Sequence, residues 1–164
     1  NLTDIYASLE QKRSDVNFIE SLLASLEKVD SLLSIEVFKH IFYSSNNIIK
    51  IKILQSMQKL SRRDDDFLFS VLEKEGAPLK NEALTLLARD SQALKIALES
   101  LLLIRSPWGR NNKVIVENII LVESLGIKEA ADYLALLARR RFFWNRNIRE
   151  KAAGVLKEWH DRKD

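Results

Sequence analysis

The sequence predicts an all-α fold, and within that class a right-handed α-solenoid built from helical hairpins. Three observations support this prediction. The 164-residue chain is rich in helix-forming Leu, Ala, Glu, Lys and Arg and has only four Gly and two Pro. Its apolar residues recur with the spacing of helices that bury one face. A similar apolar pattern also returns four times, at intervals of about 30, 36 and 33 residues, a typical period for two-helix repeats.

Each of the four repeated segments opens with an aliphatic residue, and two apolar residues follow four and five places later. The segments are Ile49–Leu60, Leu79–Ala88, Ile115–Leu125 and Ile148–Trp159. Each is predicted to be the second helix of a hairpin. Because one hairpin cannot bury its apolar face alone, stacked neighbours must bury it together.

Other segments supply the remaining predicted helices and their ends. In chain order these are Leu2–Gln11, Asp15–Lys28, Ser31–Tyr43, a helix that starts at Asp64–Asp66, Ser91–Ile104 and Ile127–Arg139. Carboxylates at a helix start accept the free N–H groups of the first turn. Gly76 ends one helix, Pro78 suits the first turn of the next, and Gly126 separates two more. Asn147 and Glu150 have the spacing of a capping box, with Asn147 as the N-cap.

We expect a single domain over residues 1–164, with about four helix pairs plus an N-terminal helix. An apolar stripe is already under way just after Asn1, which favours a piece of a longer chain. No apolar run reaches 18 residues, so no membrane insertion is expected. The absence of Cys excludes disulfides and thiolate metal ligands but does not decide the compartment; the cytoplasm is our expectation.

The last hairpin carries a resemblance to a known family. The stretches that carry it are Ala130–Ala138, the basic and aromatic run Arg139–Trp144, and Asn147–Leu156. Together they resemble a HEAT repeat of the bacterial type. Lys50, Lys80 and Arg149 match the basic residue that such repeats place after the first aliphatic residue of the second helix. The resemblance implies an α-solenoid whose second helices line the inner face. It also implies scaffolding or partner binding, and it brings no catalytic residues.

Potentially reactive groups are too scattered to indicate an enzyme. His40 and His160 are the only histidines, and neither has the spacing to bind a metal or activate a nucleophile. The acidic run Asp64–Asp66 has oxygen ligands for a hard cation, but the helix-cap interpretation is favoured. Glycine-rich phosphate-binding motifs are absent from the sequence. We therefore expect no enzyme activity, no catalytic or metal-binding residues, no cofactor and no small-molecule substrate.

Two loops rich in arginine and aromatic residues are the sharpest features of the chain. Arg105–Arg110 and Arg139–Arg146 occupy the same place in successive hairpins, so we expect them to lie side by side. Residues 1–82 hold 11 Lys/Arg against 13 Asp/Glu, whereas residues 83–164 hold 15 against 10. Arginine and tryptophan together offer bidentate anion binding and stacking. The expected partner-binding residues are Arg110, Arg140, Arg141, Arg146, Trp108 and Trp144.

Two interpretations of these loops compete. In the first, the arginines point to solvent and bind a partner. We then expect an acidic protein surface, which makes the chain a non-enzymatic protein-interaction or scaffold module; the alternative is a nucleic-acid-binding module that uses the basic C-terminal edge. In the second interpretation, the aromatic residues, including Phe142 and Phe143, fill the groove between helices while the arginines are solvated. A related view has the arginines pair with Glu129, Asp132 and Glu150, which leaves no net basic patch.

Small residues predict the closest approach of the last two helices. Ala130 and Ala131 lie in the predicted helix Ile127–Arg139, and Ala152 and Ala153 lie in the last predicted helix. Because backbones approach most closely where side chains are small, we expect Ala152 and Ala153 both to be buried against this partner.

Overall fold

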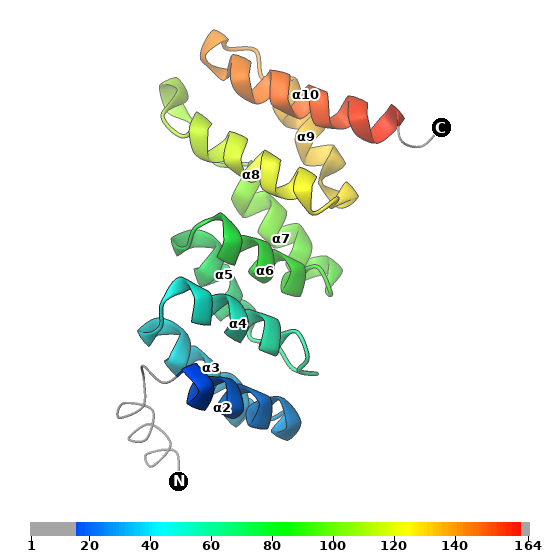
Figure 1. Ribbon diagram of the computed structural model, residues 1–164. Helices are drawn as coiled ribbons and strands as arrows, with labels where there is room; N and C mark the ends of the chain where they lie inside the picture. Colours follow the sequence, from blue (N-terminus) through cyan, green and yellow to red (C-terminus); the bar gives the residue numbers. More distant parts are fainter. Residues whose placement is uncertain (1–15, 162–164) are drawn as a thin grey trace. The chain divides into compact units, whose positions relative to one another are not determined.

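The computed structural model describes residues 16–161 (Figure 1). Over this range it contains α-helices and short 3-10 helices and no strand, which confirms the all-α class for the described part. The handedness of a solenoid and the HEAT-like assignment stay predictions. The predicted helix Leu2–Gln11 lies outside the described residues. The α-helices are α2 (Val16–Val29), α3 (Leu32–Ser44), α4 (Asn47–Met57), α5 (Asp65–Lys74), α6 (Ala77–Leu87), α7 (Ser91–Leu102), α8 (Asn112–Ser124), α9 (Ala131–Ala138) and α10 (Arg146–Asp161).

The chain divides into two compact units, with the division between Leu86 and Leu87. We call them unit 1 and unit 2 in chain order. The four repeated segments coincide with α4, α6, α8 and α10, and each follows another helix directly in the sequence, as predicted. The expectation of a single domain with about four helix pairs stays a prediction.

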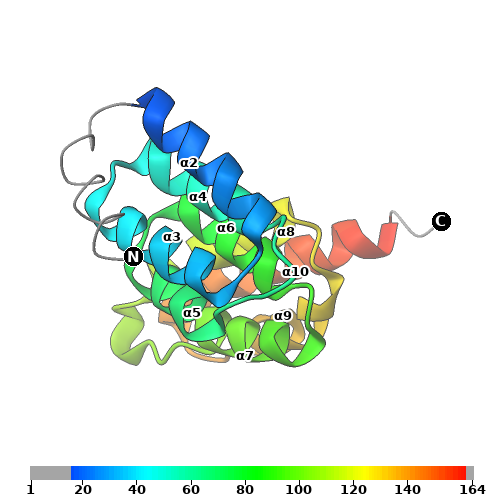
Figure 2. The ribbon, with the colours of Figure 1, turned by 90° about the horizontal axis from the view of Figure 1, so that it is seen from below.

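Unit 1 begins its described part with α2, which packs against both α3 and α4 (Figure 2). Its core includes Phe38, Phe42, Ile53 and Leu68, all almost fully buried. The Asp64 carboxylate accepts a hydrogen bond of 2.9 Å from the Phe67 N–H, so Asp64 is the N-cap of α5. The predicted helix start at Asp64–Asp66 is therefore confirmed, and the cap explains the acidic run.

Ion pairs join the helices of unit 1 across its surface. The ammonium groups and carboxylate oxygens lie 2.6–2.9 Å apart in three of these pairs, and a fourth pair makes the same kind of contact. The two residues of each pair come from different helices or from the residues next to a helix end, and they are separated by more than 20 residues in the sequence. The three are Lys39–Asp64, Lys50–Glu75 and Lys59–Glu27, and the fourth is Lys52–Glu20.

Unit 2 is formed by two successive hairpins, α7 with α8 and α9 with α10. In Figure 1, α8 and α10 lie side by side, and α7 also packs against α9. The amide of the buried Asn118 on α8 donates a 2.8 Å hydrogen bond to the Leu101 carbonyl of α7. The Lys151 ammonium on α10 lies 2.6 Å from the Glu123 carboxylate on α8. The buried amide thus joins the two helices of the first hairpin, and the ion pair joins the second hairpin to the first.

The predicted capping box at the start of α10 is wrong. The helix begins at Arg146, which leaves Asn147 inside the first turn with its side chain exposed. The Glu150 carboxylate instead accepts a 2.7 Å hydrogen bond from the Arg146 guanidinium, one turn earlier. The helix starts early because the short 3-10 helix η3 (Phe143–Asn145) leads directly into it.

The expectation for the two alanines of α10 holds for one of them. Ala152 and Ala130 are fully buried, whereas Ala153 is exposed. The buried face of α10 runs through Ile148, Ala152 and Val155, at the spacing of one helix face. Ala153 lies one residue around the helix from this face, on the exposed side of α10.

Candidate functional site

The candidate site lies on the two connections that join first to second helices in unit 2. Residues 103–111 link α7 to α8 through the 3-10 helix η1 (Pro107–Gly109), and residues 139–145 link α9 to α10 through η3. The two 3-10 helices contact one another (Figure 1). The expectation that the two loops lie side by side is therefore correct.

Hydrogen bonds from polar side chains fix the first loop and join it to the second. The Ser106 hydroxyl lies 2.6 Å from the Asn112 amide oxygen and accepts a 3.0 Å bond from the Asn111 N–H. The Asn112 amide nitrogen donates across to the Trp144 carbonyl of the second loop. Asn112 thus connects the two loops through a single side chain.

Arg149 holds the second loop from the first turns of α10. Its guanidinium donates hydrogen bonds of 3.2 and 3.4 Å to the backbone carbonyls of Arg140 and Arg141. This is the basic residue that matched the repeat pattern, and here it orders the loop within its own hairpin. The loop backbone is therefore positioned from α10.

Trp108 adopts an unusual backbone conformation at the tip of the first loop. Its φ is +53°, in the left-handed region that bulky residues rarely enter, and Gly109 follows with φ +79°. The Trp108 side chain is 78% exposed, so burial of the ring does not compensate this strain. Strained residues of this kind are concentrated at binding and catalytic sites.

Four aromatic side chains, Trp108, Phe142, Phe143 and Trp144, form what we call the aromatic cluster. Trp144 lies at its centre, with ring centroids 4.6 Å from Phe142 in a parallel stack, 5.2 Å from Trp108 and 5.1 Å from Phe143. Trp108, Phe142 and Phe143 are 61–82% exposed, and only Trp144 is half-buried. The interpretation in which these rings fill the groove between helices is therefore wrong for the three outer rings.

The four arginines expected at this edge do not share one environment. Arg110, Arg141 and Arg146 are exposed, and Arg146 lies 2.7 Å from the Glu150 carboxylate, which raises the pKa of Arg146. Arg140 differs from the expectation because it is half-buried. Its guanidinium donates a 3.4 Å hydrogen bond to the Ile104 carbonyl of the first loop, and burial lowers its pKa.

A groove of about 800 Å³ opens beside the aromatic cluster, and we call it the arginine groove. Its lining contains three arginines and no carboxylate. Asn145 also lines it, with only 5% of its surface exposed, and the Asn145 amide oxygen has no hydrogen-bond partner. The lining residues are Arg105, Ser106, Pro107, Arg140, Arg141, Phe142, Trp144 and Asn145.

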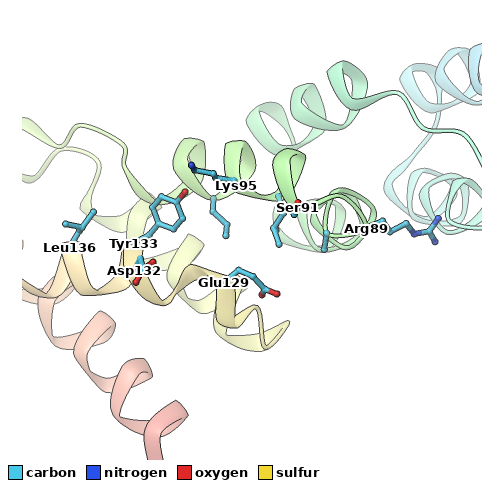
Figure 3. Close-up of a pocket in the computed structure, with 10 residues that line it drawn as sticks. Arg89, Ser91, Lys95, Glu129, Asp132, Tyr133 and Leu136 are labelled. Carbon is cyan, nitrogen blue, oxygen red and sulfur yellow. The ribbon is translucent and has the colours of Figure 1, made fainter.

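A second groove of about 610 Å³ lies between α7 and α9 (Figure 3). In that view Tyr133 and Asp132 come from α9 and Lys95 from α7. The Tyr133 hydroxyl lies 3.5 Å from the Glu99 carboxylate, and its pKa is raised by burial and by that negative charge. Acidic and basic side chains line this groove together, so it has no preference for ligands of one charge. The lining residues are Ala88, Arg89, Ser91, Leu94, Lys95, Leu98, Glu129, Asp132, Tyr133 and Leu136.

Sequence reasoning missed part of this site. Arg105 and Asn145 were not expected to contribute, although both line the arginine groove. Arg105 begins the first arginine-rich loop, so its position in that motif was an available signal. Asn145 gave no signal, because its burial depends on η3, which no apolar periodicity predicts.

Comparison of the chain with protein-family models, with curated proteins and with solved structures finds no match in any of the three. Within residues 16–161, no cluster of His, Cys, Asp and Glu is placed to hold a metal ion. None of the described helices has the length and apolar character needed to cross a membrane.

Proposed function

We propose that this chain is a non-enzymatic protein-interaction module of the HEAT-like type, and that the aromatic cluster with its neighbouring arginines binds the partner. One observation carries the proposal: three large aromatic side chains project from two adjoining loops with most of their surface in water. Trp, Phe and Arg are enriched in the buried centres of protein interfaces, where a few such residues supply most of the binding free energy.

The length of the two loops supports the same proposal. A connection of two residues is enough to join two helices in this chain, as between α3 and α4. Residues 103–111 and 139–145 are longer than that connection, and they carry the exposed rings. Loops longer than the fold requires are commonly binding loops.

The distribution of charge favours protein over nucleic acid as the partner. A nucleic-acid surface needs a continuous basic track along the phosphate backbone. On α8 and α10, three of the basic residues, Lys113, Arg146 and Lys151, pair with acids 2.6–3.9 Å away. The central ring, Trp144, is also in contact with its neighbours, which leaves no open slot between two rings for a base.

Nucleic-acid binding is the second candidate function. Arg105, Arg140 and Arg141 form no ion pair within residues 16–161, and they stand next to exposed aromatic rings. That combination is also found where single strands bind through phosphate contacts and stacking.

The test is a quantitative pull-down from the native host with three forms of the chain. The wild type is compared with the double variant Trp108→Ala/Phe143→Ala and with Ile48→Ala, which removes an equally exposed apolar side chain from unit 1. We expect a specific protein to be recovered by the wild type and by Ile48→Ala but lost with the double variant, with or without nuclease treatment. Equal recovery by all three forms contradicts the proposal, and recovery that nuclease abolishes supports the second candidate.

A further inference from the structure

We propose that the arginine groove binds an extended acidic peptide segment that carries an apolar side chain. This inference rests on the proposed function, because it names the chemistry of the partner segment at the same edge. Three features of the groove support it: its charge, its apolar wall and its unsatisfied amide.

The charge of the groove calls for an acidic occupant. Arg105, Arg140 and Arg141 line it, no Asp or Glu does, and none of these arginines pairs with an acid in the described part of the chain. Guanidinium groups bind carboxylates through paired, charge-assisted hydrogen bonds. Arg140 is anchored to the Ile104 carbonyl at 3.4 Å, so part of its ordering cost is met before a ligand arrives.

Part of the groove lining is an apolar wall. Pro107, Phe142 and Trp144 form this wall, and Phe142 and Trp144 lie in a parallel stack with a 4.6 Å centroid separation. A flat wall of this kind suits an aliphatic or proline side chain, and the volume of about 800 Å³ is within the range of binding pockets. A lining that combines arginines with aromatic rings suits a segment that combines acids with an apolar residue.

The amide of Asn145 supplies the contact that a peptide backbone would use. Its side chain is buried and lines the groove, yet its amide oxygen has no partner. Asn145 directly precedes α10, where an Asn side chain commonly caps the helix, but no such hydrogen bond satisfies this oxygen. A side-chain amide can both donate to a peptide carbonyl and accept from a peptide N–H. This oxygen has almost no surface of its own in contact with solvent, so a ligand N–H reaches it only when the Asn145 side chain turns toward the groove on binding. Because a buried unsatisfied oxygen is costly, that contact gains free energy.

The groove between α7 and α9 provides an internal contrast. It has comparable size, but the carboxylates of Glu129 and Asp132 line it together with basic residues. An acidic segment would meet like charge there. The same segment should therefore choose the arginine groove within unit 2.

The experiment is a selection of random dodecapeptides, displayed on phage, on the full chain. We expect enriched sequences in which Asp or Glu flanks an aliphatic residue or proline. The best synthetic peptide is then titrated against the wild type and three variants. Arg141→Glu should weaken binding about 10-fold or more, and Lys157→Glu, with the same change in net charge on an exposed residue of α10, should leave it unchanged.

The third variant, Asn145→Leu, separates a ligand contact from a structural role. It replaces a buried amide that has an unsatisfied oxygen with an apolar group of similar size, so the free protein should keep or gain thermal stability. Peptide affinity should fall about 3- to 10-fold, the value of one hydrogen bond. Unchanged affinity in both Asn145→Leu and Arg141→Glu overturns the inference.

The outcomes also separate this inference from the proposed function. If a protein partner depends on Trp108 and Phe143 but the selection gives no acidic sequence, the proposed function stands and the groove assignment is wrong. If oligouridylate of 12 nucleotides binds with an affinity that Arg141→Glu lowers, and no peptide is enriched, both are wrong and nucleic-acid binding replaces them.

Discussion

The connections that lead from a first helix to the second helix of its pair differ sharply in the two units. In unit 1, α3 is joined to α4 by Ser45 and Asn46, and α5 to α6 by Glu75 and Gly76. In unit 2, the corresponding connections run over residues 103–111 and 139–145 and include 3-10 helices. The short connections show what this chain needs to turn from one helix to the next. The extra length in unit 2 is therefore available for another purpose, and it carries the exposed rings and the arginine groove.

The charged side chains differ in the same way. In unit 1, lysines pair with acids from other helices, as in Lys50–Glu75 at 2.6 Å. In the arginine groove of unit 2, the arginines contact backbone carbonyls or solvent and meet no acid among the described residues. These lysines of unit 1 are thus already matched by acids, whereas the arginines of the groove are not. The predictions below change one side of this comparison at a time.

The largest effect should come from removing two exposed rings in unit 2. For Trp108→Ala/Phe143→Ala we expect partner affinity to fall about 100-fold or more, because interface hot spots are worth about 2 kcal/mol or more each. The melting temperature should change little, since both side chains are mostly in water. Titration calorimetry and thermal unfolding measure the two quantities. A large loss of stability with unchanged affinity would show that these rings serve the fold.

A substitution in the core of unit 2 should have the opposite effect, because it should lower the stability of the fold. Ala152→Leu should cost about 1–3 kcal/mol of unfolding free energy, because Ala152 is fully buried and a larger side chain overpacks α10 against its neighbours. Ala153→Leu is the matched control on an exposed position and should cost well under 1 kcal/mol. Urea denaturation of both variants checks this. Equal destabilisation by the two changes would mean that the buried face of α10 is assigned wrongly.

A charge pair of unit 1 should matter for stability alone. Asp64 caps α5 and lies 2.8 Å from the Lys39 ammonium, so Asp64→Ala should cost about 1–2 kcal/mol of unfolding free energy. Asp64→Asn keeps a capping oxygen and should lose less. Neither change should alter partner binding. Reduced affinity in Asp64→Ala, at a temperature where it is fully folded, would break the division between the two units.

The same carboxylate predicts how stability depends on pH. Burial pushes the pKa of Asp64 up, but the hydrogen bonds from Lys39 and the Phe67 N–H outweigh burial, and the net pKa is lowered. A lowered pKa in the folded state contributes stability above the unfolded pKa of about 3.9, and this stability is lost as the pH falls through the folded value. The difference between the free energies of unfolding at pH 6 and at pH 3 should therefore be smaller for Asp64→Asn than for the wild type. If the pH dependence of the unfolding free energy is the same in the two proteins, Asp64 is not the source of this stability.

The smallest effect should come from Arg149, which orders the second loop without reaching the groove. Arg149→Gln removes the hydrogen bonds to the Arg140 and Arg141 carbonyls. We expect about a 3-fold loss of partner affinity and faster hydrogen exchange in residues 139–145, because the loop must then be ordered on binding. Unchanged exchange in this loop would show that other contacts hold it.

The features that repeat along the chain could be predicted from the sequence alone. Apolar periodicity predicted the second helices α4, α6, α8 and α10, and the acidic run at Asp64 predicted a helix cap. These features depend on local spacing, which a single sequence contains. The arginine and aromatic motifs likewise directed attention to the correct pair of loops.

The predictions that the structure contradicts concern regions of irregular backbone. The 3-10 helix η3 leads into α10, so the helix starts at Arg146 and Asn147 lies inside its first turn rather than at the N-cap. Asn145, at the end of η3, is buried. The exposure of Phe142 and Phe143 follows from the same turn. No periodic pattern encodes where a loop aims its side chains, because that direction depends on contacts with the neighbouring loop, such as the Asn112 bond to the Trp144 carbonyl.

The most direct test of the central claim uses the three tryptophans as reporters. The chain is labelled with 5-fluorotryptophan, and ¹⁹F NMR spectra are recorded while the partner recovered from the host is added. Trp108 and Trp144 belong to the aromatic cluster, whereas Trp159 is 8% exposed on the last turns of α10 and serves as the internal control. Our account predicts that the Trp108 and Trp144 resonances shift on binding and that the Trp159 resonance keeps its position. Binding that shifts Trp159 and leaves Trp108 and Trp144 in place would contradict it.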